Sequence, residues 1–167
     1  GALYYTVVAS DAELSFATGR VLGGLVFSLG LALVIVGGAE LFTGNNLIVM
    51  AWASRKVTTG EMMRNWLIVY LGNLAGALGV AVLVLLSHHL DMNGGRIGLS
   101  ILNTAVAKIQ PDVFTLFIKG ILCNVLVCLA VWLAYAGRSV TDKILAPILP
   151  ISAFVAAGFE HCVANMY

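Results

Sequence analysis

One imidazole stands in an apolar run near the end of this sequence, and it is the side chain best suited to proton chemistry. The run from Ile144 to Tyr167 holds Glu160, His161 and Asn165 among apolar residues. Ionisable groups at membrane depth cost roughly 2.5–3.5 kcal/mol each on insertion scales, so their default interpretation is a site on an internal cavity or pathway. His161 is therefore the candidate centre, with a packed, hydrogen-bonded core histidine as the alternative.

A second stretch repeats the spacing found around His161. Residues 38–45 and 158–165 share the pattern Gly-x-Glu-x-x-x-x-Asn. The copies fall in the second and fifth predicted membrane spans, so we expect them to cross the membrane in opposite directions. That arrangement is an inverted repeat, in which interrupted helices meet near the membrane midplane. We interpret the acidic and amide residues of both copies as structural support for broken helices, with the carboxylates bonding amides exposed at the breaks: Glu40, Glu160, Asn45 and Asn165.

The bulk composition indicates an all-α polytopic membrane protein in a lipid bilayer. Hydrophobic residues make up 60% of the 167 residues and charged residues 10%, against about 25% charged in a soluble domain. The mean hydropathy is +1.00. The net charge of +1 and the absence of a basic face give no indication of a nucleic-acid partner.

Five apolar segments are predicted to lie in the membrane. The run over 21–53 is longer than the about 20 residues that cross a bilayer upright, so we predict a break between Gly37 and Asn46. Two prolines and Gly158 interrupt the last run. The chain begins and ends inside apolar runs, so we expect residues 1–167 to be a single, incomplete transmembrane channel domain: the end of helix 1 (1–9), broken helix 2 (21–53), helix 3 (66–87), helix 4 (113–136) and part of broken helix 5 (144–167).

The basic residues predict the orientation. The polar loops 54–64 and 137–143 carry an excess of Lys and Arg and lie on one side, which is the cytoplasm by the positive-inside rule. The polar turn from Ala9 to Ser15, with its two acidic residues, then faces outward. So does the amphiphilic segment 88–112, part of which we predict to be a short interfacial helix ending at Lys108.

Neither a metal site nor a cofactor is predicted. The three cysteines lie in apolar runs without a CxxC pair, so they behave as small hydrophobes. His88 and His89 diverge by about 100° on a helix and do not form a ligand pair. No serine, cysteine or metal-ligand set completes a catalytic constellation around His161, so an enzyme is not expected. An intramembrane enzyme and a structural multispan scaffold are the alternatives from other functional classes.

Several motifs, in this order along the whole chain, resemble the formate/nitrite transporter family, and within it the formate channels. They are Gly38-Ala-Glu-Leu-Phe-Thr43, Asn65-Trp-Leu-Ile-Val-Tyr-Leu-Gly-Asn73, Gly120-Ile-Leu-Cys-Asn124, Cys128-Leu-Ala-Val-Trp132, Gly137-Arg-Ser139 and Gly158-Phe-Glu-His-Cys-Val-Ala-Asn-Met166. The resemblance implies an aquaporin-like fold of six helices in an inverted 3+3 repeat, with interrupted second and fifth helices. It also implies a homopentamer with one pore per protomer, in the inner membrane of a prokaryotic cell.

The resemblance also implies roles for single residues. His161 matches the central pore histidine, Thr43 the loop threonine that faces it, and Asn124 the pore-side asparagine of the fourth helix. Lys108 matches the lysine that biases the outer vestibule toward anions. Four residues match the two apolar constrictions: Phe27, Leu31, Leu41 and Phe154. The stretch 44–46, Gly-Asn-Asn, departs from the small hydroxyl or β-branched residues of some formate channels and leaves the substrate open.

These residues support a transport hypothesis. An isolated anion loses its hydration at an apolar constriction, and protonation removes most of that cost. Formate would be drawn in by Lys108, pass one constriction, and take a proton from or through His161 before passing the other. Burial disfavours the imidazolium and a nearby anion favours it, so substrate occupancy and protonation are expected to be coupled. Nitrite and hydrosulfide are the alternative substrates, and a channel and a proton-coupled carrier are both compatible with the residues.

Overall fold

The computed structural model describes residues 2–9 and 15–166, and over these residues it contains helices and no strands. Residues 10–14 of the polar turn predicted from Ala9 to Ser15 lie outside the described residues. Four segments are long and apolar enough to cross a membrane: Phe16–Gly37, Thr59–Leu86, Val113–Ala136 and Val140–Ala157. The helices are α1 (Ala2–Val8), α2 (Phe16–Gly37), η1 (Asn45–Leu47), α3 (Ile48–Ala53), α4 (Thr59–Leu86), η2 (His89–Asp91), α5 (Arg96–Ile109), α6 (Val113–Ala136), α7 (Val140–Leu145), α8 (Ile148–Ala157) and η3 (Ala164–Met166).

Three helices begin earlier than the hydropathy pattern predicted. The starts at residues 21, 66 and 144 are too late, because a side-chain cap precedes each of these apolar runs. Ser15 Oγ accepts from the amide of Thr18 at the start of α2. Capping boxes at Thr58 and Ser139, each closed by the acidic residue three positions later, begin α4 and α7 within the segments predicted as polar loops. The loops in the structure are therefore shorter than predicted, because a helix can begin as soon as its first backbone amides are hydrogen-bonded.

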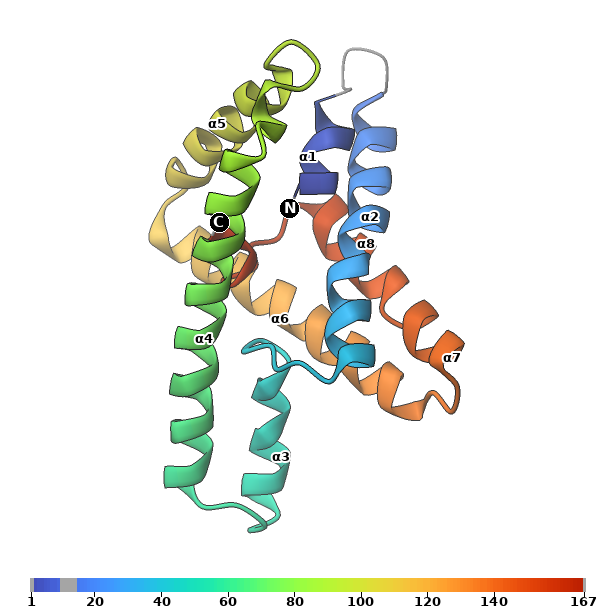
Figure 1. The fold of residues 1–167 in the computed structure, drawn as a ribbon. Helices are drawn as coiled ribbons and strands as arrows, with labels where there is room; N and C mark the ends of the chain where they lie inside the picture. Colours follow the sequence, from blue (N-terminus) through green and yellow to red (C-terminus); the bar gives the residue numbers. More distant parts are fainter. Residues whose placement is uncertain (1, 10–14, 167) are drawn as a thin grey trace.

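Two of the long apolar runs are interrupted. In Figure 1, α2 descends to a loop, from which η1 and α3 continue downward beside α4. The pair α7 and α8 rises from the lower right toward the centre, where the chain leaves helix again before η3. The first break covers residues 38–44 and the second residues 158–163. The first break is exposed from Gly38 to Glu40 and becomes buried at Thr43, and the second is buried at His161.

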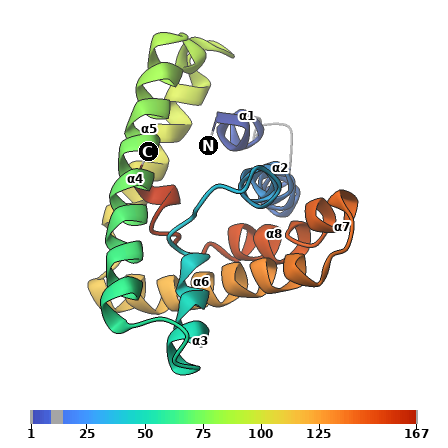
Figure 2. The same ribbon diagram turned by 60° about the horizontal axis from the view of Figure 1, so that its bottom comes forward.

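Packing around the breaks brings α2, α6 and α8 together, as the view in Figure 2 also shows. Where α2 crosses α8, a Cβ on Gly24 would lie 2.8 Å from the backbone of Ser152, so this crossing depends on a glycine. The buried core comprises Leu31, Cys123, Val127, Ala130, Val131, Ile151 and Phe154. By contrast, α4 exposes a long apolar surface that includes Leu67 and Leu83, as expected for a helix that faces lipid or other membrane helices.

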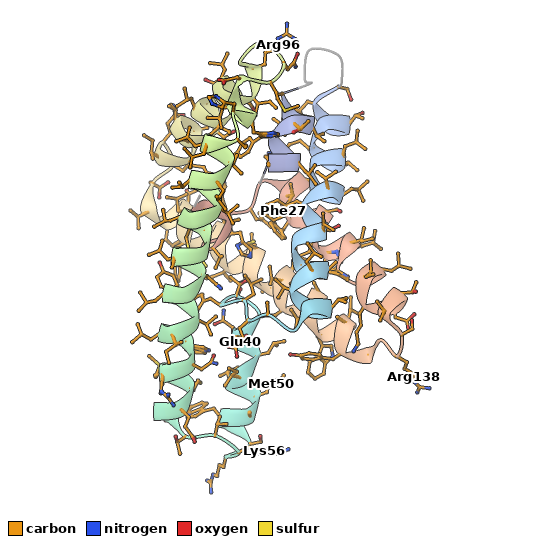
Figure 3. All side chains as sticks on the ribbon, in the orientation of Figure 1. Phe27, Glu40, Met50, Lys56, Arg96 and Arg138 are labelled. Atoms are coloured by element: carbon orange, nitrogen blue, oxygen red, sulfur yellow. The ribbon has the colours of Figure 1, made fainter. Side chains whose placement is uncertain are left out.

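The charged loops lie at opposite ends of the molecule. Figure 3 places Arg96 at the upper end, Lys56 at the lower end and Arg138 on the lower right, with Phe27 and Glu40 between these levels. The predicted interfacial helix is α5, which ends at Ile109, one residue beyond Lys108. The breaks are thus held between two polar ends.

Candidate functional site

The two breaks meet at one hydrogen bond. Thr43, from the first break, and His161, from the second, lie 3.1 Å apart between Oγ1 and Nε2. Only 3% of Thr43 and 8% of His161 are exposed. The structure therefore brings together the two residues that the repeat and the family resemblance had singled out.

The backbone after His161 determines which ring nitrogen carries the proton. The amide of Ala164 donates to Nδ1 at 3.0 Å, so Nδ1 is an acceptor and the neutral ring carries its proton on Nε2. Nε2–H then donates to the Thr43 hydroxyl. The ring of Phe154 stacks on the imidazole with 5.6 Å between centroids and an interplanar angle of 23°. Backbone, hydroxyl and aromatic ring together hold the imidazole in one orientation.

The helix ends that lead into the breaks have the same backbone geometry. Gly38 (φ 68°, ψ 25°) and Gly158 (φ 73°, ψ 32°) both adopt the left-handed conformation that ends a helix and favours glycine. The next amide bonds back across the helix end in both cases, from Ala39 to Val34 O and from Phe159 to Phe154 O, each at 3.0 Å. The repeated glycines thus serve the same local purpose.

The repeated acidic and amide residues also pair in the same way. Nδ2 of Asn45 donates to Glu40 Oε2 at 2.7 Å, and Nδ2 of Asn165 donates to Glu160 Oε2 at 2.9 Å. The hydrogen bonds found for these carboxylates come from side chains and not from the backbone amides that we had expected. Each carboxylate closes its break through an asparagine on the far side of the gap.

Three side chains of α4 hold the first break from outside. Asn73 accepts from the amide of Phe42 at 2.9 Å and donates to the carbonyl of Glu40 at 3.1 Å. Asn65 donates to Glu40 Oε2, and the indole of Trp66 donates to the carbonyl of Asn45, each at 3.0 Å. In the sequence, Asn73 was named only as the last residue of a family motif and was given no role. The available signal was the occurrence of several polar side chains within an otherwise apolar span.

A single charged residue of α5 holds the second break. Nζ of Lys108 lies 2.5 Å from Oε2 of Glu160, and the two side chains are 35% and 14% exposed. The carboxylate of Glu160 thus partly compensates the charge of Lys108, which lines the same cavity as His161. The first break is held by neutral amides and an indole, and the second by an ion pair.

A cavity of about 810 Å³ opens on one side of His161. Phe27 and Phe154 line it in edge-to-face contact, with ring centroids 6.0 Å apart. Leu31 and Leu41, the other predicted constriction residues, pack in or against the buried core beside these rings. The aromatic pair stands directly beside the imidazole.

A second cavity, of about 780 Å³, lies beside Thr43 and is also lined by Asn124 and Cys128. His161 lines both cavities. Asn124 is not hydrogen-bonded to the imidazole. Its Nδ2 contacts Sγ of Cys128 at 3.7 Å, and that thiol contacts the carbonyl of Thr43 at 3.7 Å. Asn124 Oδ1 is buried and has no hydrogen-bond partner among the described residues.

Residues 2–9 and 15–166 contain no group of three or more His, Cys, Asp or Glu side chains that could hold a metal ion. His88 bonds Asp91 at 2.9 Å at an exposed helix end. The imidazole of His161, which lines both cavities, can form hydrogen bonds and transfer a proton.

Comparison with known proteins gives consistent matches along the chain. The family model described as formate/nitrite transporter matches residues 1–167. The formate channel FocA of Haemophilus influenzae is 46% identical over 164 residues, which cover 98% of this chain and 58% of that relative. The nitrite transporter NirC of Salmonella typhimurium is 39% identical over 151 residues, 86% of this chain and 52% of NirC. The solved structure of a pentameric formate channel with formate bound superposes with a TM-score of 0.89 at 38% identity, covering 98% of this chain and 64% of that one. The chain thus spans a little over half the length of the relatives it matches.

Proposed function

Because the chain belongs to the formate/nitrite transporter family, we propose that it lines a membrane pathway for formate and related small monovalent weak-acid anions. The observation that carries this proposal is the position of His161, which lines two cavities and is hydrogen-bonded to Thr43 across the two breaks. The family is one of transporters and not of enzymes, and the four membrane-length helices make this a multi-pass membrane protein.

Proton transfer at His161 is the proposed chemical step. A neutral ring with its proton on Nε2 is a poor acid, whereas an imidazolium has two donors. An anion arriving near the ring favours the imidazolium, which forms when Nδ1 takes up a proton and gives up its bond from the Ala164 amide. Nε2 then passes a proton to the anion, and the neutral acid crosses the next apolar constriction at much lower cost.

The surrounding residues receive supporting roles in this proposal. Thr43 and Asn124 supply hydrogen bonds to the substrate in the second cavity, where Asn124 Oδ1 is free to accept one from the protonated acid. Phe27 and Phe154 form one constriction together with Leu31, and Leu41 contributes to the other. Lys108, paired with Glu160, provides positive charge at the cavity wall beside His161.

The proposed architecture is an aquaporin-like inverted 3+3 repeat of six helices. The matched left-handed glycines and the matched Glu–Asn pairs at the two breaks support it. We further propose a homopentamer in the inner membrane of a prokaryotic cell, with the end that carries Lys56 and Arg138 in the cytoplasm. The pentameric channel among the structural neighbours and the bacterial relatives support these assignments.

Flux measurements on the full-length gene product in proteoliposomes test the function. Formate should enter much faster than lactate, and comparison with nitrite and hydrosulfide ranks the family's alternative substrates. Nitrite is the second candidate because the matches include NirC, a nitrite transporter. Flux of none of these ions would contradict the proposal and favour a structural scaffold. Conversion of a substrate by the purified protein would favour an enzyme.

A further inference from the structure

The larger cavity carries more positive than negative charge. Among the described residues that line it, the basic side chains are Arg20, Arg96, Lys108 and Lys119, and the acidic one is Glu160. Because Lys108 is paired with Glu160, the carboxylate offsets part of the lysine charge for an approaching anion. A further cation deep in the cavity would add to the attraction that Lys108 exerts.

Arg20 lies deeper in the molecule than Arg96, which is exposed at the start of α5. Its guanidinium rests against the end of α8, where a Cβ on Gly158 would lie 2.6 Å from Nη2. The carboxyl end of a helix carries partial negative charge and favours a cation there. This contact explains how an arginine is held at the cavity wall without a carboxylate partner among the described residues.

The guanidinium also has unused hydrogen-bonding capacity. Nη1 contacts the hydroxyl of Tyr4 at 3.5 Å, which is long for a hydrogen bond. Nε is buried and has no hydrogen-bond partner in the described part of the chain. Arginine presents a planar fork of donors that matches the two oxygens of a carboxylate.

Arg20 stands at the outer end of a series of aromatic rings that leads to His161. It lies two helical turns before Phe27 on the same face of α2, a rise of about 10 Å. The ring of Tyr4 contacts that of Phe27 edge-on with centroids 6.2 Å apart, and Phe27 in turn contacts Phe154, which stacks on the imidazole. An anion bound at Arg20 would therefore meet the aromatic constriction next and His161 after it.

We propose that Arg20, with the Tyr4 hydroxyl beside it, is an anion-capture subsite for a small carboxylate or similar monovalent oxyanion. This inference rests on the proposed function, because it names the place where the substrate first binds. The site acts before the constriction, so it sets the concentration at which uptake saturates and leaves the proton step at His161 unchanged.

The test is the dependence of uptake on formate concentration in proteoliposomes containing the full-length gene product. Replacing Arg20→Gln should raise the half-saturating concentration about tenfold, the change expected for the loss of one nearby charge in a partly hydrated site. The maximal rate should change by less than about twofold. Arg20→Lys, which keeps the charge, should recover most of the loss. Arg96→Gln is the matched control, because it removes an exposed cation of the same cavity and should stay within about twofold of the wild type.

Arg20→His provides a second variant if the glutamine protein does not fold. The histidine gains its charge as the pH is lowered. The ratio of its half-saturating concentration to that of the wild type at the same pH should therefore decrease as the pH is lowered from about 8 to about 5.5. The capture subsite is overturned if Arg20→Gln shows the wild-type dependence of uptake on formate concentration. It is also overturned if the ratio of half-saturating concentrations for Arg20→His stays constant as the pH changes. Absence of formate uptake by the wild type would instead contradict the proposed function itself.

Discussion

The two breaks share their backbone geometry but differ in what holds them. Each begins with a left-handed glycine and is closed by a Glu–Asn pair. The first is then fixed by neutral groups of α4, whereas Lys108 holds the second through an ion pair on the wall of a cavity. Neutral hydrogen bonds respond little to an arriving ion. A charged pair responds directly. We therefore expect the break that carries Thr43 to be rigid and the break that carries His161 to be sensitive to an arriving ion.

Charge reversal at the second break is expected to have the largest effect. Lys108→Glu would set two carboxylates against each other beside His161, and formate uptake should fall by at least about tenfold, because each tenfold corresponds to about 1.4 kcal/mol of unfavourable interaction. Glu40→Gln is the matched change at the first break and should alter uptake by less than about threefold, since its partners there are neutral amides.

The double variant Lys108→Glu/Glu160→Lys serves as the control for this charge reversal. Restoring the pair with exchanged ends should recover part of the lost uptake. Equal uptake by Lys108→Glu and the wild type would remove the distinction between a charged and a neutral break.

Removing the clamp on the first break should have an intermediate effect. Asn73→Ala loses two hydrogen bonds to the break, and at about 1 kcal/mol each the free energy of unfolding should fall by about 2 kcal/mol. Uptake should also fall, because Thr43 is no longer held against His161. Thermal unfolding in detergent and a formate-uptake assay measure the two effects. Unchanged stability would mean that α4 does not fix this break.

The two glycines give the finest test of the comparison. Gly38→Ala and Gly158→Ala each place a side chain in the left-handed region, at a cost of about 1–2 kcal/mol. The space around Gly38 is open, whereas a Cβ at Gly158 meets the guanidinium of Arg20. We expect similar losses of thermal stability in the two variants, but a higher half-saturating formate concentration only for Gly158→Ala. Identical uptake curves would show that the contact with Arg20 has no part in transport.

The spans and the breaks could be predicted from the sequence because they depend on local pattern. Apolar length and repeated glycines located both interruptions, a polar residue in an apolar run pointed to His161, and the family resemblance pointed to Thr43. The early start of α4 could also be predicted from the sequence, because Thr58 and Glu61 have the spacing of a capping box. Hydropathy alone places this start at residue 66, where the apolar run begins.

Long-range partners could not be predicted in the same way. The bonds from Asn73 to the first break, and the contact of Arg20 with the end of α8, join segments whose separation in the sequence carries no pattern. The pairing of Lys108 with Glu160 likewise depends on where α5 packs. These contacts follow from the arrangement of whole helices, which the composition of each helix does not determine.

The most direct test of the central claim is the pH dependence of formate uptake by His161→Phe compared with the wild type, between about pH 5 and pH 8. The phenyl ring keeps the packing against Phe154 but can neither donate to Thr43 nor carry a proton. We predict that the substitution abolishes uptake or removes its pH dependence, while the detergent-solubilised variant remains folded. A folded variant with wild-type uptake across this range would contradict the proposed proton transfer at His161.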